Sequence, residues 1–220
     1  MFFSCSLIAL GNGTACRETE AWITELFKNG ILDSEKIFYS IISEQGSSIY
    51  SCSKIGEKEF PKLDPKLRSA ISIARRLNDP LCEYIKIEPK HLGIGMYQHD
   101  INEKQLSQTL NYVVTECVSF VGVDINSASI NLLSFVAGLT ENRAEKIINH
   151  RNKNGKFKTR EDLLKVSKIG PKIFEQCAGF LKIDPSTANI QSVNEYNKFD
   201  STWIHPESYT LAEKYVILFL

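Results

Sequence analysis

The sequence LLSFVAGLTENRAEKII at residues 132–148 and the sequence LLKVSKIGPKIFEQCAGFL at residues 163–181 decide the fold of the second half of this chain. Each begins with a short apolar run and passes through a tight turn that ends on Gly138 or Gly170. Each then continues with apolar side chains at three- and four-residue spacing, which is the spacing of one helix face. The two copies, about 32 residues apart, predict two helical hairpins between residues 129 and 183.

The chemistry of the two turns suits a phosphate group. Gly138 and Gly170 place no Cβ between the backbone and a ligand, and glycine adopts dihedral angles that other residues avoid. Each turn leads into a helix whose first N–H groups are unpaired and whose dipole is positive at that end, which favours an anion. Thr140 is a candidate N-cap residue, and Pro171 suits the first helical turn.

Basic residues gather around the second turn, where Lys168 and Lys172 can make charge-assisted contacts with a phosphate. The first turn, residues 135–139, has no cation of its own. Residues 140–183 contain eleven Lys and Arg against five Asp and Glu, in a chain whose formal net charge is zero. Such clustering is typical of a nucleic-acid surface. The predicted nucleic-acid-binding residues are Gly138, Thr140, Arg143, Lys146, Lys168, Ile169, Gly170 and Lys172.

Two such copies resemble a tandem helix-hairpin-helix domain, a family of DNA-binding modules without sequence specificity. The resemblance implies that at least the second hairpin binds the phosphate backbone. Backbone contacts carry no base readout, so the expected partner is DNA, RNA or both. The alternative is that both turns only pack helices or dock another protein.

The composition of the whole chain limits other classes of function. At 220 residues the chain can hold one or two domains. Its six cysteines are scattered, without a Cys-x-x-Cys pair, so we expect no zinc site, no disulfide framework and a reducing, intracellular compartment. No apolar run reaches the length of a membrane span. We expect no membrane partner, no small-molecule substrate, no bound metal and no cofactor.

The first part of the chain predicts a parallel strand–helix–strand unit. Residues 6–10 and 36–42 are the expected strands, and the helix between them, residues 15–29, ends at Gly30. The loop Gly11-Asn12-Gly13 allows a dinucleotide site as an alternative. However, Cys16 stands where that fingerprint needs its third glycine.

Further helices are predicted over residues 47–60, 65–77 and 103–120, with a loop-rich stretch at 78–100. In the helix at 65–77 an apolar face is expected to pack against the rest of the domain. The arginines would then lie on a solvated or domain-facing surface; the alternative is that they contact nucleic acid. The apolar residues are Leu67, Ala70, Ile71, Ala74 and Leu77, and the arginines are Arg68, Arg75 and Arg76.

The composition changes after residue 183. Residues 184–202 are rich in Asn, Ser and Asp and predict a flexible connection, followed by a helix over 205–220. That helix ends in six apolar residues, 215–220, which would be an aggregation hazard at a free terminus. The sequence therefore looks cut, or continued in a segment that it does not contain.

Four segments resemble the Tex family of transcription accessory proteins: GNGTACRETE at 11–20, SEQGSSIYS at 43–51, LRSAISIARRL at 67–77, and the stretch from DPL at 79–81 to GIGMYQHD at 93–100. The resemblance covers residues 8–183, with a weaker echo at 204–207. It implies an α/β fold, a partial RNase H-like domain of YqgF type, followed by an all-α tandem helix-hairpin-helix domain, mostly helical overall.

The same resemblance implies a division of the chain. Residues 1–88 would be the later part of the RNase H-like domain, and 89–128 a connecting helical region. Residues 129–183 would be the hairpin domain, and 184–220 a linker with a truncated terminal helix. It also implies a fragment or short isoform of a eukaryotic member, contact with the transcription machinery, and residence in the nucleus or cytoplasm.

The resemblance to RNase H-like enzymes raises the question of nuclease activity. Such enzymes hold two metal ions with several carboxylates. Glu44 matches the position of one family carboxylate, but the late aspartate is replaced around Arg68 and Ser69. One carboxylate cannot organise two magnesium ions, so we expect a catalytically inert scaffold with no catalytic residue. The alternatives are a metal-dependent nuclease or resolvase, and a protein–protein adaptor in a transcription complex.

Overall fold

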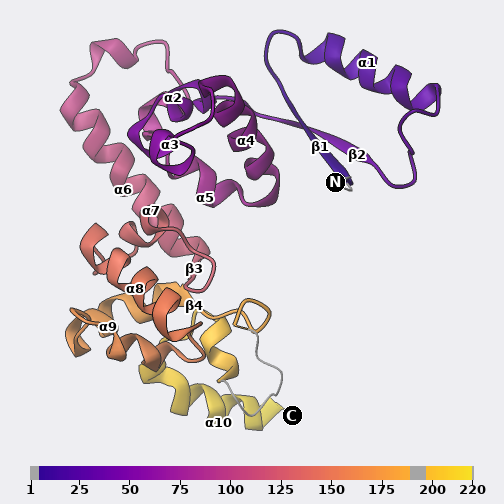
Figure 1. Ribbon diagram of the computed structural model, residues 1–220. Helices are drawn as coiled ribbons and strands as arrows, with labels where there is room; N and C mark the ends of the chain where they lie inside the picture. The colour runs from indigo at the N-terminus through magenta and orange to yellow at the C-terminus, as the bar shows by residue number, and fades with distance from the viewer. Residues whose placement is uncertain (1–4, 189–196, 220) are drawn as a thin grey trace. The chain divides into compact units, whose positions relative to one another are not determined.

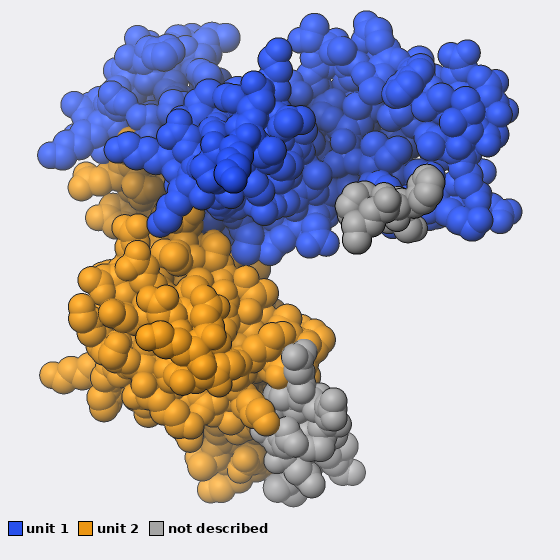
Figure 2. All heavy atoms as spheres, in the orientation of Figure 1, with its two compact units in different colours: residues 1–106 blue, residues 107–220 orange. Residues whose placement is uncertain are grey.

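The computed structural model describes residues 5–188 and 197–219 (Figure 1). Its contacts divide the chain into two compact units, unit 1 with residues 1–106 and unit 2 with residues 107–220 (Figure 2). The described elements are mostly helical, as expected. The four-part division expected from the sequence stays a prediction. Among the described residues, no helix combines the length and the apolar character that crossing a membrane requires.

Unit 1 begins with the expected strand–helix–strand unit. Strand β1 (Leu7–Gly11) pairs in parallel with β2 (Phe38–Ile42), so that Ala9 lies opposite Ser40. Helix α1 (Cys16–Lys28) connects them, and Gly30 follows its C-cap with φ +70°. Parallel strands require such a crossover, and a left-handed glycine ends the helix without steric cost. This part of the prediction is confirmed.

The loop between β1 and α1 is closed by a carboxylate of the chain itself. The Asn12 side chain accepts a hydrogen bond from the Glu44 N–H at 3.0 Å, and the Asn12 N–H donates to the Ile42 carbonyl at 3.0 Å. The Glu44 carboxylate fills the space where Gly11 and Gly13 lack a Cβ. An acidic group therefore faces this loop, where the dinucleotide interpretation requires room for a phosphate.

The helix predicted over residues 47–60 is two helices, α2 (Ser47–Ser51) and α3 (Lys54–Glu59). The interruption has a local cause, because Ser53 is in extended conformation and its hydroxyl accepts a hydrogen bond from the Gly56 N–H at 3.1 Å. Serine competes for backbone groups in this way and starts a new helix as its N-cap. The stretch is therefore helical, as predicted, but Ser53 divides it into two helices.

Helix α4 (Pro65–Asn78) forms where expected but buries the opposite face from the one predicted. Arg68 and Arg76 are buried, whereas Leu67 is 54 % exposed. The Arg68 Nη1 donates to the Ser51 carbonyl at 3.1 Å, and the Arg76 Nη1 donates to two carbonyls that flank Glu44. Guanidinium groups satisfy the carbonyls that the short preceding elements leave unpaired. The prediction that the arginines lie on a solvated surface was therefore wrong for Arg68 and Arg76.

The rest of unit 1 is short helices and loops. Helix α5 (Pro80–Tyr84) is followed by the 3-10 turns η1 (Pro89–His91) and η2 (Gln98–Asp100). The buried Lys86 ammonium pairs with Glu83 at 2.5 Å and with Glu59 at 3.0 Å. The pair with Glu59, 27 residues away in the chain, ties this segment to α3.

Unit 2 contains the two helical hairpins, which confirms that prediction. Helix α6 (Glu103–Val121) starts in unit 1 and continues into unit 2. The first hairpin is α7 (Ile130–Ser134) and α8 (Glu141–Asn154). The second is the 3-10 helix η3 (Arg160–Lys165) and α9 (Pro171–Cys177). Strands β3 (Val123–Asp124) and β4 (Leu181–Lys182) pair in parallel and join the two ends of the hairpin pair.

One apolar core lies beneath both hairpins. Its residues come from the predicted apolar positions of each hairpin and from the strands that close the pair. Asn126 is buried beside it and exchanges two hydrogen bonds of 2.9 Å with the backbone of Phe157, which fixes the loop between the hairpins. The core includes Val118, Val123, Ile125, Leu133, Val136, Ala144, Ile147, Phe157, Leu163, Val166, Cys177, Leu181 and Ile183.

The end of the chain is more ordered than the sequence predicts. Residues 189–196, part of the predicted flexible connection, lie outside the described residues. After them come η6 (Lys198–Ser201), η7 (Pro206–Ser208) and α10 (Tyr209–Phe219). Asp200 is buried, and its carbonyl accepts a hydrogen bond from the Ile183 N–H at 2.9 Å. The prediction of a flexible connection is therefore wrong for residues 198–201.

Candidate nucleic-acid interface

The two hairpins repeat with a spacing of 30 residues. Ser129 and Thr159 begin the two copies, and Gly138 and Lys168 are equivalent residues in the turns. Both turn residues are left-handed, with φ +78° at Gly138 and φ +68° at Lys168. Gly170 is instead extended at the N-cap of α9, the position that Thr140 has before α8. Matching Gly138 with Gly170, about 32 residues apart, was therefore wrong by two positions.

The first turn is packed inside unit 2. A Cβ at Gly138 would lie 3.0 Å from the Gln176 Cβ and 3.6 Å from the Ile173 carbonyl oxygen, both on α9. The Arg143 Nη1 donates to the Gly138 carbonyl at 2.9 Å. Glycine here permits one hairpin to approach the other closely, and Arg143 closes its own turn. These contacts use the first turn for packing.

The second turn is open. No atom lies within 4 Å of the position that a Cβ would take at Gly170. Lys168 and Lys172 are exposed on either side of it. The Lys168 Nζ donates to the Asn142 side-chain oxygen at 3.2 Å, a contact between exposed groups that a ligand can replace. This turn is accessible and positively charged.

The other predicted binding residues have mixed positions. Ile169 is buried, and its N–H donates to the Val166 carbonyl at 3.2 Å, so its side chain faces the core. Thr140 is exposed at the N-cap of α8, and its hydroxyl makes no capping hydrogen bond. Lys146 is half-buried on α8, one turn after Arg143. The structure thus brings Lys168, Gly170 and Lys172 to one open surface.

Much of the positive charge of residues 140–183 is used inside the fold. The Arg151 Nη1 donates to the carbonyls of Ile125 and Ala128 at 2.9 and 3.1 Å. Lys165 forms an ion pair with Asp162 at 2.7 Å, and this pairing lowers the pKa of Asp162 against the effect of burial. The number of basic residues in the sequence therefore overstates the positive charge available to a ligand. Because these cations already have partners in the protein, the candidate interface is confined to the second turn.

Sequence reasoning missed Arg160, the largest of the fully buried side chains. Its Nε donates to the Leu181 carbonyl at 2.7 Å, its Nη1 to the Ile204 carbonyl at 2.6 Å, and its Nη2 to the Thr202 carbonyl. These carbonyls belong to β4 and to the C-terminal segment. Arg160 therefore attaches the end of the chain to the second hairpin, and no sequence pattern marks this role.

The Tyr209 hydroxyl bridges Arg160 to a buried acid. The Arg160 Nη1 donates to the Tyr209 Oη at 2.7 Å, and that hydroxyl donates to Asp200 at 2.6 Å. Burial, followed by the hydrogen bond to Asp200, raises the pKa of Tyr209 above its usual range. We define Arg160, Asp200 and Tyr209 as the C-terminal cluster.

Comparison with known proteins gives two family matches. The Tex protein YqgF-like domain matches residues 2–78, and the helix-hairpin-helix motif matches residues 118–182. Protein YhgF of Escherichia coli (strain K12) is 48% identical over 94% of this chain. The chain belongs to the Tex family. The predicted fold class, a YqgF-like α/β part followed by helix-hairpin-helix elements, is thereby confirmed.

Two further relatives of this Tex-family chain carry informative names. Transcriptional accessory protein Tex of Neisseria gonorrhoeae is 45% identical over 94% of the chain, and S1 RNA-binding domain-containing protein 1 of Homo sapiens is 47% identical over 97%. The chain spans only about a quarter of these relatives, 26% and 25% of their lengths.

In the YqgF-like part, the Glu44 carboxylate is the one that lies directly against the glycines of the loop after β1, Gly11 and Gly13. Ser69 stands on α4 near the position where a late aspartate was expected, and its hydroxyl donates to the Ser47 hydroxyl of α2 at 2.9 Å. Within residues 5–188 and 197–219, no three His, Cys, Asp or Glu side chains are grouped so that they can hold a metal ion.

Proposed function

We propose that this chain is a nucleic-acid-binding segment of a transcription-associated factor, and that its second hairpin binds the phosphate backbone without sequence specificity. The observation that carries the proposal is the open turn at Gly170, which Lys168 and Lys172 flank, in a chain with a helix-hairpin-helix match. Two lysines at an accessible backbone turn suit a polyanion. The proposal places the chain with nucleic acid and the transcription machinery, in the nucleus or the cytoplasm.

The YqgF-like part is proposed to be an inert scaffold. Glu44 lies against its loop, and no three acidic, His or Cys side chains of the described residues cluster for a metal, whereas a two-metal reaction requires several carboxylates that clamp both ions. A nuclease or resolvase is the second candidate. Magnesium-dependent cleavage of labelled duplex or single-stranded substrate by the purified chain, lost in Glu44→Gln, would favour it over the scaffold.

The main test is fluorescence anisotropy with labelled duplex DNA, single-stranded DNA and RNA at two salt concentrations. We expect Lys168→Glu/Lys172→Glu to weaken binding at least about tenfold, because two phosphate contacts become repulsive, and to reduce the slope of log affinity against log salt by about 1 per lysine. Glutamate at position 168 keeps a side chain with a Cβ, so the backbone strain there is unchanged.

The matched control is Lys58→Glu/Lys62→Glu, which changes the net charge equally at two exposed lysines with the same spacing. It should bind as the unchanged chain does. Equal losses in both double variants would indicate a general charge effect and contradict the hairpin proposal. A folded chain that binds none of the three probes would favour the third candidate, an adaptor that docks a protein through the hairpins.

A further inference from the structure

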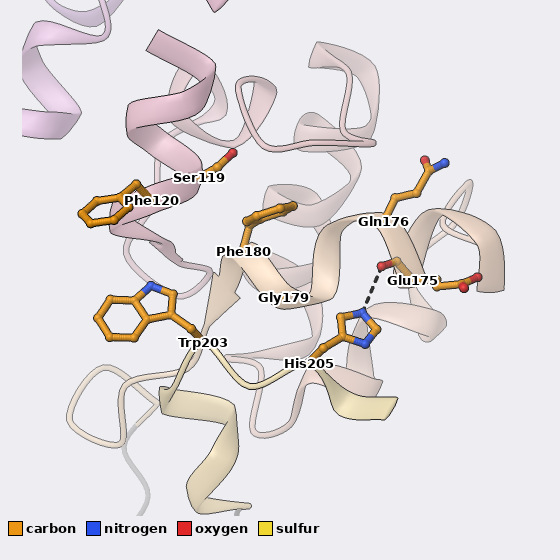
Figure 3. Close-up of a pocket in the computed structure, with 8 residues that line it drawn as sticks. All are labelled: Ser119, Phe120, Glu175, Gln176, Gly179, Phe180, Trp203 and His205. Atoms are coloured by element: carbon orange, nitrogen blue, oxygen red, sulfur yellow. Dashed lines mark hydrogen bonds between the residues drawn. The ribbon is translucent and has the colours of Figure 1, made fainter. Parts of the chain in front are cut away.

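An apolar groove of about 620 Å³ lies on the second hairpin (Figure 3). It runs along the C-terminal part of α9 and the turn η4 (Ala178–Phe180), and the end of α6 and the segment before η7 form its other walls. All of these segments belong to unit 2. The residues that line it include Ser119, Phe120, Glu175, Phe180, Trp203 and His205.

Three aromatic rings surround one end of this groove. Phe120, Phe180 and Trp203 come from three separate segments and lie around the same space (Figure 3). Phe120 is 82% exposed and Trp203 is 63% exposed, although both are large and apolar. Flat aromatic faces that are open to solvent are typical stacking platforms for the bases of single-stranded nucleic acid.

The charges at the groove favour an uncharged flat group over a phosphate. The Lys182 ammonium lies 3.8 Å from the centroid of the Trp203 ring and donates to the Val121 carbonyl at 2.9 Å, so it supports the tryptophan from the protein side. Glu175 is exposed at the opposite end and repels a phosphate. The Ser119 hydroxyl is a polar group of the lining that can meet the edge of a base.

The groove is within reach of a strand held at the open turn. The open turn directly precedes α9 and the groove borders its C-terminal part, and the seven residues of this helix, Pro171–Cys177, span about 10 Å at 1.5 Å per residue. A strand whose phosphate contacts Lys168 and Lys172 can therefore place a base in the groove a short distance along its backbone. A duplex cannot do so, because its bases are paired and stacked inside.

We infer that the groove stacks an unpaired nucleobase of a single-stranded nucleic acid. The inference rests on the proposed function, since the hairpin would hold the backbone of the same strand. It adds a base contact that the hairpin turn lacks. An apolar segment of a protein is the competing occupant, and the test separates the two.

The test uses Trp203 as its own reporter. The chain has two tryptophans, and in a Trp22→Phe background the only indole is in the groove. This variant of the full chain is titrated with a thymidine decanucleotide and with an abasic decanucleotide, which has the same phosphates and no bases. We expect the thymidine strand to quench Trp203 fluorescence and to bind at least about fivefold more tightly than the abasic strand.

A variant of the groove wall supplies the second measurement. Phe120→Ala should weaken binding of the thymidine strand at least about fivefold and leave duplex binding unchanged. Tyr112→Ala is the matched control, because Tyr112 is 72% exposed on the same helix and does not line the groove. It should change neither affinity.

Each outcome bears on one of the two proposals. Equal affinity for thymidine and abasic strands, without quenching, would overturn the base-stacking inference even where the lysine variant confirms the hairpin. Quenching that persists in Lys168→Glu/Lys172→Glu with unchanged affinity would support the groove and contradict the hairpin. Absence of binding by every strand would overturn both and leave the groove to a protein segment.

Discussion

Replacing Arg160 with methionine is expected to destabilise unit 2 by about 3–5 kcal/mol, the usual result of removing one partner from a buried charged network. Methionine has a similar volume, so the loss is of hydrogen bonds and charge. The carbonyls of Leu181 and Ile204 would lose their donor, and each buried polar group left unpaired costs about 1–3 kcal/mol. Asp200 would also lose the cation that reaches it through Tyr209.

Denaturant titration followed by Trp203 fluorescence, in the Trp22→Phe background, measures this loss in the correct unit. Trp203 follows Thr202, whose carbonyl accepts from Arg160. Tyr209→Phe removes only the bridging hydroxyl and should cost about 1–2 kcal/mol. Lys153→Met, on an exposed part of α8, should change stability by less than about 0.5 kcal/mol. If Arg160→Met lies within 1 kcal/mol of the unchanged chain, the C-terminal cluster is not a structural anchor.

The C-terminal cluster also shows where sequence reasoning ends. An arginine is normally an exposed residue, and its burial depends on carbonyls that come from segments 21 to 44 residues away in the chain. Arg68 and Arg76 are buried for the same reason in unit 1. The sequence of α4 has an apolar face, but this face is not the one that packs. The arginine face packs instead, because its guanidinium groups pair with carbonyls of α2 and of the segments beside it.

The hairpins were predictable because their signals are local. Apolar spacing and Pro171 act within one turn of helix. The register of the repeat was not predictable. The sequence suggested that Gly138 matches Gly170, whereas the backbone conformation makes Lys168 the equivalent residue. The groove was missed because its three aromatic walls come from positions 120, 180 and 203, and only the fold brings them together.

The two left-handed turn residues provide the second large effect. Gly138→Ala should destabilise unit 2 by about 2 kcal/mol, since alanine is strained at φ +78° and its Cβ would lie 3.0 Å from the Gln176 Cβ of α9. Gly30→Ala is the useful comparison. Gly30 has φ +70° with nothing within 4 Å, so in unit 1 this change reports the backbone strain without the contact. A smaller loss at position 30 would assign the difference to hairpin packing, and equal losses would contradict a packing role for Gly138.

Lys168→Gly is the complementary change at the equivalent residue. Relief of the left-handed strain, less the entropy that glycine adds to the unfolded chain, should stabilise unit 2 by about 0.5–1 kcal/mol. The same variant loses one cation of the open turn, so affinity for single-stranded DNA should fall while stability rises. Among the described residues, Lys168 alone combines a side chain with positive φ, and strain of this kind concentrates at functional sites. A variant that gains stability and keeps full affinity would show that the strained lysine does not contact the ligand.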